Sequence, residues 1–404
     1  MLQSPKIKEV YAAPGNAGTA KVAHNLEINP SDIEGLAETA QKEKIDLALV
    51  GPEALLAEGI VDHFESKGIP IFGPSKAAAQ IEASKVFSKE LVKKYNIPCA
   101  QSTSFSDYDE AKEYIKRQKP PLVVKADGLA AGKGVTVASS IAEALTALSN
   151  IMQDRAFGAA GDKVVIEECL KGEEMSSFAF TDGETVIPMV AACDYKPVYD
   201  GDKGPNTGGM GSYSPPHFYS PELESTVTES ILKPTVAAMR SEGKPYKGVL
   251  YGGLMITTGG PKVLEFNARF GDPETQVVLP RLKTDLVDIL LAVVNGKLNQ
   301  IEVKWSDDAC VGVVMASGGY PGSYKTGFPI QGLNDLDKDI LVFHAGTKIG
   351  SAGELLTSGG RVLTVVATGK TLAGARDEVY QNLPRIWFEN CHYRKDIAEI
   401  DRGW

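Results

Sequence analysis

Cysteine and histidine are scarce in this chain, and their spacing excludes two classes of site. The 404 residues include five cysteines and five histidines. Because no Cys-x-x-Cys pair occurs, the spacing predicts neither a disulfide framework nor a structural zinc site, and it favours reduced, buried thiols. No histidine has a partner at metal-ligand or catalytic-triad spacing, so we assign none of them a catalytic role.

Long apolar runs and an excess of basic residues are also absent. The apolar stretches are of strand length, such as 311–316, whereas a membrane-spanning helix needs about 20 apolar residues. The first residues lack the basic and apolar regions of a secretion signal, so we expect a cytoplasmic protein without a membrane partner. The net charge of −10 argues against a nucleic-acid partner. Small phosphorylated ligands stay possible, because they need only a local cluster of donors.

Strands and helices alternate in the first 80 residues. The length predicts roughly two to four domains, and 1–82 reads as a doubly wound parallel sheet. Ligands of such sheets bind beyond the carboxyl ends of the strands. The expected strands 7–13, 45–50 and 69–72 end there in turns at Gly15, Gly51 and Gly73.

The rest of the chain predicts a mixture of α/β and α+β units. Helices are expected at 75–95, 221–241 and 275–295. We expect a hairpin with strands 122–126 and 135–137, a loop at 194–215, and a small C-terminal domain from about residue 309. The remaining strands are expected at 164–168, 176–180, 186–192, 248–257, 263–267, 311–316 and 361–367.

A glycine-rich hairpin tip at 127–134 carries chemistry between two lysines, Lys125 and Lys133. Glycine lets backbone N–H groups approach a phosphate, and lysine adds a point charge. The spacing does not match a Walker A loop. A surface hairpin with solvated lysines explains the pattern about as well, so phosphate binding stays an open alternative here.

A second stretch, 263–275, reads LEFNARFGDPET after its first valine. Glu265 and Asn267 lie on one face of a strand, and their oxygens suit Mg²⁺, which keeps further positions for phosphate and water. Arg269 lies on the same face if the strand continues, and it can stabilise developing negative charge. A half-exposed strand with a polar face is the alternative, but the adjoining Gly-Asp-Pro-Glu turn favours a site.

Two weaker patterns complete the inventory. The glycine-rich loop 202–211 can cradle a substrate with backbone groups, or it can be an irregular surface loop. The strand 165–170 with Glu174 beyond it can present its backbone to an adenine ring and a carboxylate to a ribose. A strand that simply ends in solvated glutamates would have the same sequence pattern, and this alternative stays open.

Together these stretches resemble the phosphoribosylamine–glycine ligase family of the ATP-grasp superfamily over nearly the whole chain. GPNTGGMG at 204–211 with EFNARFGDPE at 265–274 is highly specific. The other matching stretches are APGNAGTA at 13–20, VGPE at 50–53, IFGPS at 71–75, KADGLAAGKGV at 125–135, IEE at 166–168, GEEMSSF at 172–178, GVVMASGGYPG at 312–322 and FHAGT at 343–347.

The resemblance implies an ATP-grasp fold in three parts. These are an N-terminal domain (1–82), an ATP-grasp domain (83–303) with a lid at about 100–170, and a C-terminal domain (304–404). It also implies a carbon–nitrogen ligase of purine biosynthesis that joins glycine to 5-phosphoribosylamine. Glycine carboxylate takes the γ-phosphate of ATP to form glycyl phosphate, and the amine of phosphoribosylamine then displaces phosphate. The chain is expected to be a monomer.

The resemblance also implies roles for individual residues. Arg269 and Lys133 are expected to be catalytic, and Glu265 and Asn267 to bind Mg²⁺ or Mn²⁺. The expected ATP-binding residues are Lys85, Lys125, Lys133, Glu167, Glu168, Leu170 and Glu174. The expected substrate-binding residues are Gly15, Asn16, Asp194, Lys196, Asn206, Thr207, Gly208, Gly209, Arg269 and Asp272.

One departure from the family concerns the first strand and a glycine-rich turn of the type GxGGREHA. The chain matches the family only after that turn, as if a strand–turn–helix unit of roughly 20 residues were missing. We therefore expect a form that binds ATP but is weak or inactive in ligation. Unchanged turnover and melting temperature after restoring the upstream residues would contradict this expectation.

Three rival functions are distinguishable by experiment. Another ATP-grasp ligase, such as a carboxylase, would release ADP with a different acid, although the motifs after residue 200 argue against it. A silent ATP-binding protein would bind nucleotide without turnover. A nucleic-acid-binding module is disfavoured by the charge, and it would bind at low salt.

Overall fold

The computed structural model describes residues 1–129 and 134–399. Its N-terminal part has the expected alternation of parallel strands and helices, but the strands form two separate pairs instead of one continuous sheet. The strands are only two residues long, and Leu49 is 41% exposed, whereas a doubly wound sheet is covered on both faces. The pairs are β1 (Tyr11–Ala12) with β2 (His24–Asn25) and β3 (Ala48–Leu49) with β4 (Ile71–Phe72), and the helices are α1 (Ile33–Lys42), α2 (Glu53–Glu58) and α3 (Ile60–Ser66).

The single helix expected at 75–95 is wrong, because the structure has two helices, α4 (Lys76–Ala83) and α5 (Lys85–Lys94). Ser84 between them has an extended backbone, and its hydroxyl accepts a hydrogen bond from the backbone N–H of Phe87. Serine at this position caps a new helix start. The break turns the first residues of α5 toward the hairpin β6–β7.

The expected hairpin is confirmed as part of a small antiparallel sheet of order β5-β8-β6-β7. Two helices cover this sheet and share a core with it. We call this unit the lid. Its elements are β5 (Ser102–Phe105), α6 (Tyr108–Lys116), β6 (Leu122–Ala126), β7 (Val135–Ala138), α7 (Ile141–Met152) and β8 (Val164–Glu168).

A four-stranded antiparallel sheet of order β10-β9-β15-β16 lies at the centre of the molecule. The helix expected at 221–241 is present as α8, a π-helical turn and α9. The helix expected at 275–295 is wrong: the segment around Leu282 pairs with Trp305 and is extended, so α10 and α11 are separate. The bounds are β9 (Glu173–Asp182), β10 (Val186–Pro188), α8 (Pro221–Val227), α9 (Lys233–Ser241), β15 (Lys247–Thr257), β16 (Gly260–Asn267), α10 (Thr275–Val278) and α11 (Leu286–Val294).

The segment 194–215, expected to be a loop, contains strands. Two of them join the C-terminal sheet of order β11-β14-β17-β21-β18, and the other two form the hairpin β12–β13. The loop expectation was wrong because β14 pairs with the distant strand β17, Gly211 opposite Val313, and β11 in turn pairs with β14. The strands β12 and β13 pair locally, but their glycine- and proline-rich sequence does not show the alternation of a strand. The bounds are β11 (Cys193–Asp194), β12 (Pro197–Tyr199), β13 (Lys203–Asn206), β14 (Gly211–Ser214), β17 (Ala309–Ala316), β18 (Leu341–His344), β19 (Thr347–Ile349), β20 (Leu355–Thr357), β21 (Arg361–Gly369) and α12 (Leu372–Asn382).

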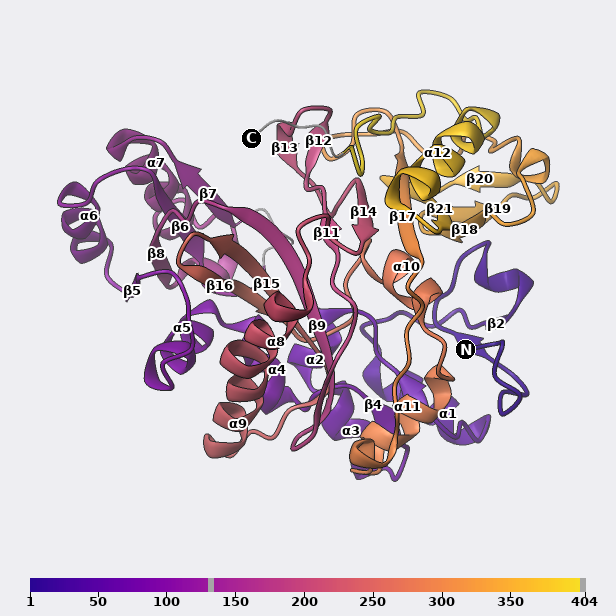
Figure 1. The fold of residues 1–404 in the computed structure, drawn as a ribbon, viewed down its shortest axis with the longest axis horizontal. Helices are drawn as coiled ribbons and strands as arrows, with labels where there is room; N and C mark the ends of the chain where they lie inside the picture. Colours follow the sequence, from indigo (N-terminus) through magenta and orange to yellow (C-terminus); the bar gives the residue numbers. More distant parts are fainter. Residues whose placement is uncertain (130–133, 400–404) are drawn as a thin grey trace.

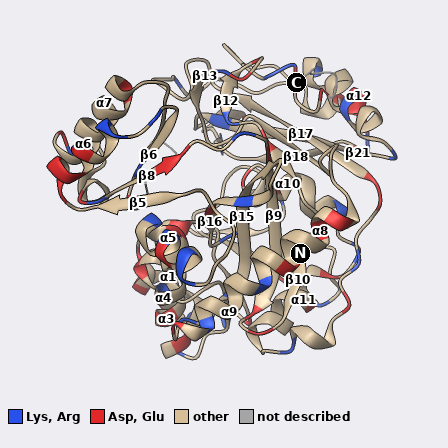
Figure 2. Ribbon diagram, turned by 60° about the vertical axis from the view of Figure 1, so that its left-hand side comes forward, with Lys and Arg blue, Asp and Glu red and all other residues tan. Residues whose placement is uncertain are grey.

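The lid and the C-terminal sheet lie on opposite sides of the central sheet (Figure 1). Helices α2 to α4 lie below it, beside α9 and α11. Acidic and basic residues are interspersed on outer helices such as α6 and α12 (Figure 2). Within the described ranges, no helix combines the length and apolar character needed to cross a bilayer.

Candidate active site

A cleft of about 820 Å³ lies where these units meet. Its walls come from the start of α2, from α4 and α5, the lid, β15 and β16, the turn after β16, the residues on either side of the hairpin β12–β13, and the C-terminal sheet. Ten of the residues predicted from the sequence line it: Lys85, Lys125, Asp194, Lys196, Thr207, Gly208, Glu265, Asn267, Arg269 and Asp272.

A buried carboxylate organises the lysines at one end of the cleft. Glu167 on β8 is 2% exposed, and its two oxygens lie 3.0 Å from the ammonium groups of Lys89 and Lys125. Burial lowers the pKa of Lys89, and Glu167 offsets this in part. Glu167 was expected to line the nucleotide pocket, but it does not face the cleft because both of its oxygens are held by the lysines.

Lys125 keeps one donor available for a ligand. Besides its ion pair with Glu167, its ammonium group donates to the backbone carbonyl of Leu264, at 3.2 Å. A lysine ammonium carries three hydrogens. No described residue accepts the remaining hydrogen, which can therefore meet an anion in the cleft.

The stem of the lid is fastened to the start of α5. Asp127 accepts a hydrogen bond from the N–H of Val86 and another from the hydroxyl of Ser84, both at 3.1 Å. Lys85 donates to the carbonyl of Gly128 at 3.0 Å. Lys133, expected to be catalytic and to contact phosphate, lies outside the described residues.

Glu265 and Asn267 reach the cleft from β16. Phe266 between them is 3% exposed and packs in the hydrophobic core, as the alternation along a strand predicts. Among the described residues, neither polar side chain has a hydrogen-bond partner. Their oxygens are therefore available for a ligand on the floor of the cleft.

Arg269 follows the end of β16, and two glutamates hold it. Its Nε donates to Glu53 at 2.7 Å, and an Nη lies 3.7 Å from Glu82. Burial raises the pKa of Glu82 to about 7, although Arg269 and the N–H of Ala268 favour the ionised form. Arg269 is thus kept at the cleft by α2 and α4 instead of by its own strand.

A second charged cluster occupies the opposite wall. Lys196 donates to Glu174 at 2.7 Å and to Asp194 at 3.0 Å. Burial alone would lower the pKa of Lys196, but the two carboxylates raise it well above its usual value. Lys196 also lowers the pKa of Glu174, which borders a small adjoining cavity rather than the main cleft.

Glu274 is a buried carboxyl group behind this cluster. It is 2% exposed and accepts hydrogen bonds from Tyr251 at 2.5 Å and Ser176 at 3.1 Å. Burial and the neighbouring Asp194 raise the pKa of Glu274. Burial also raises the pKa of Asp194, and the negative charge of the neighbouring Glu174 raises it further.

The loop that follows β13 is held at the cleft by Arg361. This side chain donates to the carbonyl of Gly208 at 2.7 Å and pairs with Asp272 at 2.6 Å. A side chain at Gly209, where φ is +107°, would collide with Pro273. Glycines here let the loop pack tightly against the Gly-Asp-Pro-Glu turn.

Six further predicted residues do not line the cleft. Asn16 is turned away because its amide holds the carbonyl of His344, at 2.8 Å, and its oxygen caps the turn after Gly15. Glu168 accepts from the N–H of Gln101 at the far end of β8. Gly15, Leu170, Asn206 and Gly209 likewise lie outside the lining, as does Glu168.

Several cleft residues were not assigned a role from the sequence. Glu53 and Glu274 stand inside the motifs VGPE and EFNARFGDPE, and Lys89 lies four residues after the predicted Lys85, so a closer reading of these stretches could have found them. His344 lies in the motif FHAGT and could have been found in the same way. Glu82, Tyr251 and Arg361 come from distant parts of the chain, and none of them lies in a motif named above. Their side chains converge only through the tertiary fold.

Family models match the chain along most of its length. The N domain of phosphoribosylglycinamide synthetase matches residues 1–82, the ATP-grasp (A) domain 83–275 and the C domain 310–400. Phosphoribosylamine–glycine ligase of Caldanaerobacter subterraneus is 51% identical over 397 residues, which covers 98% of this chain and 94% of that protein. The Escherichia coli K12 protein of the same name is 48% identical over 407 residues, with coverage of 100% and 94%.

Solved structures agree with these matches. Phosphoribosylamine–glycine ligase of Thermotoga maritima superposes with a TM-score of 0.84 at 35% identity, covering 96% of this chain and 94% of that one. The biotin carboxylase domain of Hydrogenobacter thermophilus 2-oxoglutarate carboxylase, solved with MgADP and bicarbonate, superposes with a TM-score of 0.75 at 16% identity, covering 95% and 86%. The second likeness concerns the ATP-grasp fold alone. The chain belongs to the phosphoribosylglycinamide synthetase, or phosphoribosylamine–glycine ligase, family.

Proposed function

We propose that this cleft joins glycine to 5-phosphoribosylamine and converts ATP to ADP and phosphate. The observation that carries the proposal is the meeting of three kinds of group in one cleft of a chain from this family. Lysines that suit phosphates lie at one end, metal-binding oxygens lie on the floor, and Arg269 and Lys196 lie on the remaining walls. Acyl-phosphate chemistry needs these groups more than it needs a nucleophile of the protein.

Glu265 and Asn267 fit a divalent cation. Both offer unpartnered oxygens on one strand face, and two protein ligands suffice when phosphates and water complete an octahedral shell. A bound cation would neutralise charge on the ATP phosphates. Within the described ranges, no cluster of three or more His, Cys, Asp or Glu side chains suits a metal. The proposed site therefore depends on the nucleotide, with Mg²⁺ or Mn²⁺ as the ion.

Lys85 and Lys125 are proposed to bind the phosphates of ATP. Each has a hydrogen left after the contacts described above, and both enter from the side of the lid. Lys133 is proposed to add a further contact from the hairpin tip. That Glu168 and Leu170 border the adenine ring, with Glu174 near the ribose, stays a prediction.

The first chemical step is attack of a glycine carboxylate oxygen on the γ-phosphorus, which breaks the bond to ADP and gives glycyl phosphate. Arg269 holds the transferring group, since its guanidinium has donors beyond those given to Glu53 and Phe270. The amine nitrogen of phosphoribosylamine then attacks the acyl carbon, loses a proton and expels phosphate. Lys196, Thr207, Gly208 and Asp272 are proposed to hold glycine and phosphoribosylamine during both steps.

Three broader features belong to the same proposal. The chain is proposed to act as a monomer in the cytoplasm, with small molecules as its partners and no nucleic acid. All five cysteines are free in the structure, as expected for a reducing compartment.

Oxygen transfer from glycine tests the proposed intermediate. The reaction is run with ATP, Mg²⁺, freshly generated phosphoribosylamine and glycine labelled with ¹⁸O in its carboxylate. Glycyl phosphate carries one carboxylate oxygen as the bridge to phosphorus, so the released phosphate should contain one ¹⁸O atom. Formation of product with unlabelled phosphate would contradict the mechanism.

A further inference from the structure

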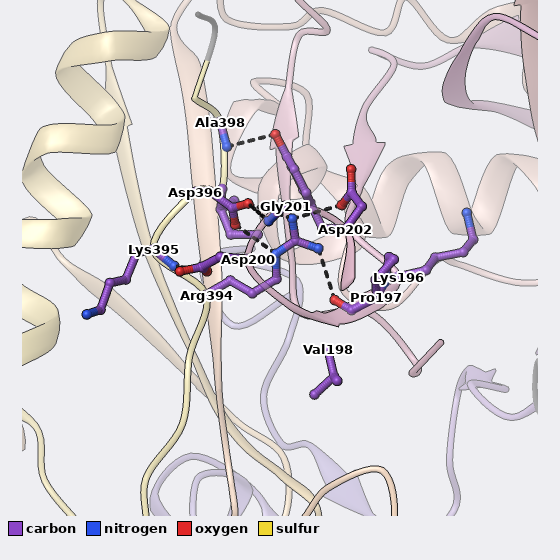
Figure 3. A network of polar contacts seen from close by, with 12 residues as sticks. Lys196, Pro197, Val198, Asp200, Gly201, Asp202, Arg394, Lys395, Asp396 and Ala398 are labelled. Carbon is purple, nitrogen blue, oxygen red and sulfur yellow. Dashed lines mark hydrogen bonds and ion pairs between the residues drawn. The ribbon is translucent and has the colours of Figure 1, made fainter. Parts of the chain in front are cut away.

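Arg394 is a fully buried charge outside the cleft. Its guanidinium donates to both oxygens of Asp396, at 2.8 and 2.9 Å, and to Asp202 at 2.8 Å. It also donates to the carbonyl of Pro197 at 2.9 Å, and it stacks over the ring of Tyr195 with a centroid distance of 4.7 Å. A buried arginine costs free energy unless it is paired, and here each of its three nitrogens donates to at least one acceptor (Figure 3).

These contacts join the segment 394–396 to the whole hairpin β12–β13. Pro197 begins the first strand, Asp202 lies in the turn, and two backbone bonds add to the grip. The N–H of Gly201 donates to Asp396 at 2.7 Å, and the N–H of Lys395 donates to Asp200 at 2.8 Å. The segment 394–396 thus acts as a clamp on the hairpin, both at its turn and at the first residue of β12.

The residues that flank the open end of the same hairpin line the cleft. Lys196 precedes β12, and Thr207 follows β13. The N–H and the hydroxyl of Thr207 both donate to the carbonyl of Lys196, at 2.8 Å each. Tyr195, whose ring stacks against the guanidinium of Arg394, lies in the chain between the cleft residues Asp194 and Lys196. A shift of the clamped hairpin is therefore transmitted to these cleft residues.

We propose that Arg394 is a positioning residue for the ligation, which holds the hairpin so that Lys196, Thr207 and Gly208 keep their places. The inference rests on the proposed function. Arg394 has no contact with Lys85 or Lys125, which belong to α5 and the lid. Its loss should therefore affect the use of glycine and phosphoribosylamine while leaving nucleotide binding intact.

The test compares Arg394→Lys with a matched control, Asn382→Ala. Lysine keeps the charge but loses the planar fork that meets Asp396 and Asp202 together. Asn382 is also completely buried in the C-terminal unit, and its side chain contacts Asp337 and Glu378. Both variants should lower the melting temperature. A change in kinetic constants that occurs only in Arg394→Lys therefore reports positioning rather than stability.

Kinetics give the first readout. In Arg394→Lys, kcat/KM for glycine should fall between about tenfold and about a hundredfold, the scale of an ångström-sized misplacement. The KM for ATP should match the wild type, and Asn382→Ala should keep both constants. Unchanged constants in Arg394→Lys would overturn the inference, as would an equal loss of ATP binding.

Hydrogen exchange gives a second readout that does not need activity. Amides of residues 195–211 should exchange faster in Arg394→Lys than in the wild type and in Asn382→Ala. If the wild type lacks substrate-dependent ADP release, the proposed function fails while this exchange result still decides whether the clamp exists.

If Arg394→Lys does not fold, Asp202→Asn takes its place, because it keeps the pair of Arg394 with Asp396. Unchanged exchange in the hairpin would overturn the clamp.

Discussion

At the scale of single residues, the cleft depends on charges that are buried in groups. Glu167 sits between Lys89 and Lys125, with all three side chains almost completely inaccessible to solvent. Replacement by a neutral side chain leaves two buried ammonium groups near each other. Removal of one member of such a group is strongly destabilising because the remaining charge has no partner.

Glu167→Gln should lower the free energy of unfolding by about 3–5 kcal/mol. It should also weaken ATP binding, since Lys125 loses its anchor. Glu168→Gln is the matched control: the Glu168 side chain is 41% exposed and pairs with Lys262 at 3.6 Å, so less than about 1 kcal/mol should be lost. Urea denaturation of both variants measures the difference. Equal losses would show that the buried cluster has no special role.

Glu82 predicts a pH dependence of stability. Burial raises its pKa from 4.5 to about 7, so the folded state binds this proton more tightly than the unfolded state does. The contribution to stability is complete below pH 4.5 and is lost as the pH rises through 7. Over this range it amounts to at most about 3 kcal/mol, from 2.5 pKa units.

In Glu82→Gln this titration is absent. The wild type should therefore lose stability relative to the variant between pH 5 and pH 8, where the difference isolates the single carboxyl group from all others. Denaturant midpoints at several pH values provide the measurement. A difference in stability that does not vary with pH would show that Glu82 is ionised throughout.

At the scale of elements, the break between α4 and α5 links helix capping to the lid. Ser84→Ala removes the cap of α5 and the hydroxyl contact with Asp127, and should cost about 1 kcal/mol. Ser75→Ala removes the cap of α4 and should cost a similar amount, but Ser75 does not touch the lid. Only Ser84→Ala should also weaken nucleotide binding in calorimetry. Equal nucleotide affinities of the two variants would show that the helix break at Ser84 does not position the lid for nucleotide binding.

Elements with strong local patterns could be predicted from the sequence. The hairpin β6–β7, the strands β15 and β16 and the face shared by Glu265 and Asn267 follow from alternation and glycine placement. The helix breaks at Ser84 and near Leu282 could not be predicted, because capping and pairing with Trp305 override a continuous helical pattern. The hairpin β12–β13 was missed for a related reason, since its clamp comes from residues 394–396.

At the scale of the whole molecule, the cleft exists only because distant units meet. The motifs identified the lysines and the strand β16, but the contacts that fix Arg269, Gly208 and Lys196 come from α2, β21 and β9. Such long-range contacts have no local sequence signal. The chain spans 94% of the length of the Caldanaerobacter relative, and the same units are matched throughout.

The most direct test of the central claim is ADP release in the presence of ATP and Mg²⁺. Glycine and freshly generated phosphoribosylamine are supplied together, and each is then omitted. The account predicts release over many turnovers only when both substrates are present, whatever the rate, because ADP forms only with glycine and the glycyl phosphate is consumed only by the amine of phosphoribosylamine. Release that continues without glycine, or an absence of release with ATP bound, would contradict it.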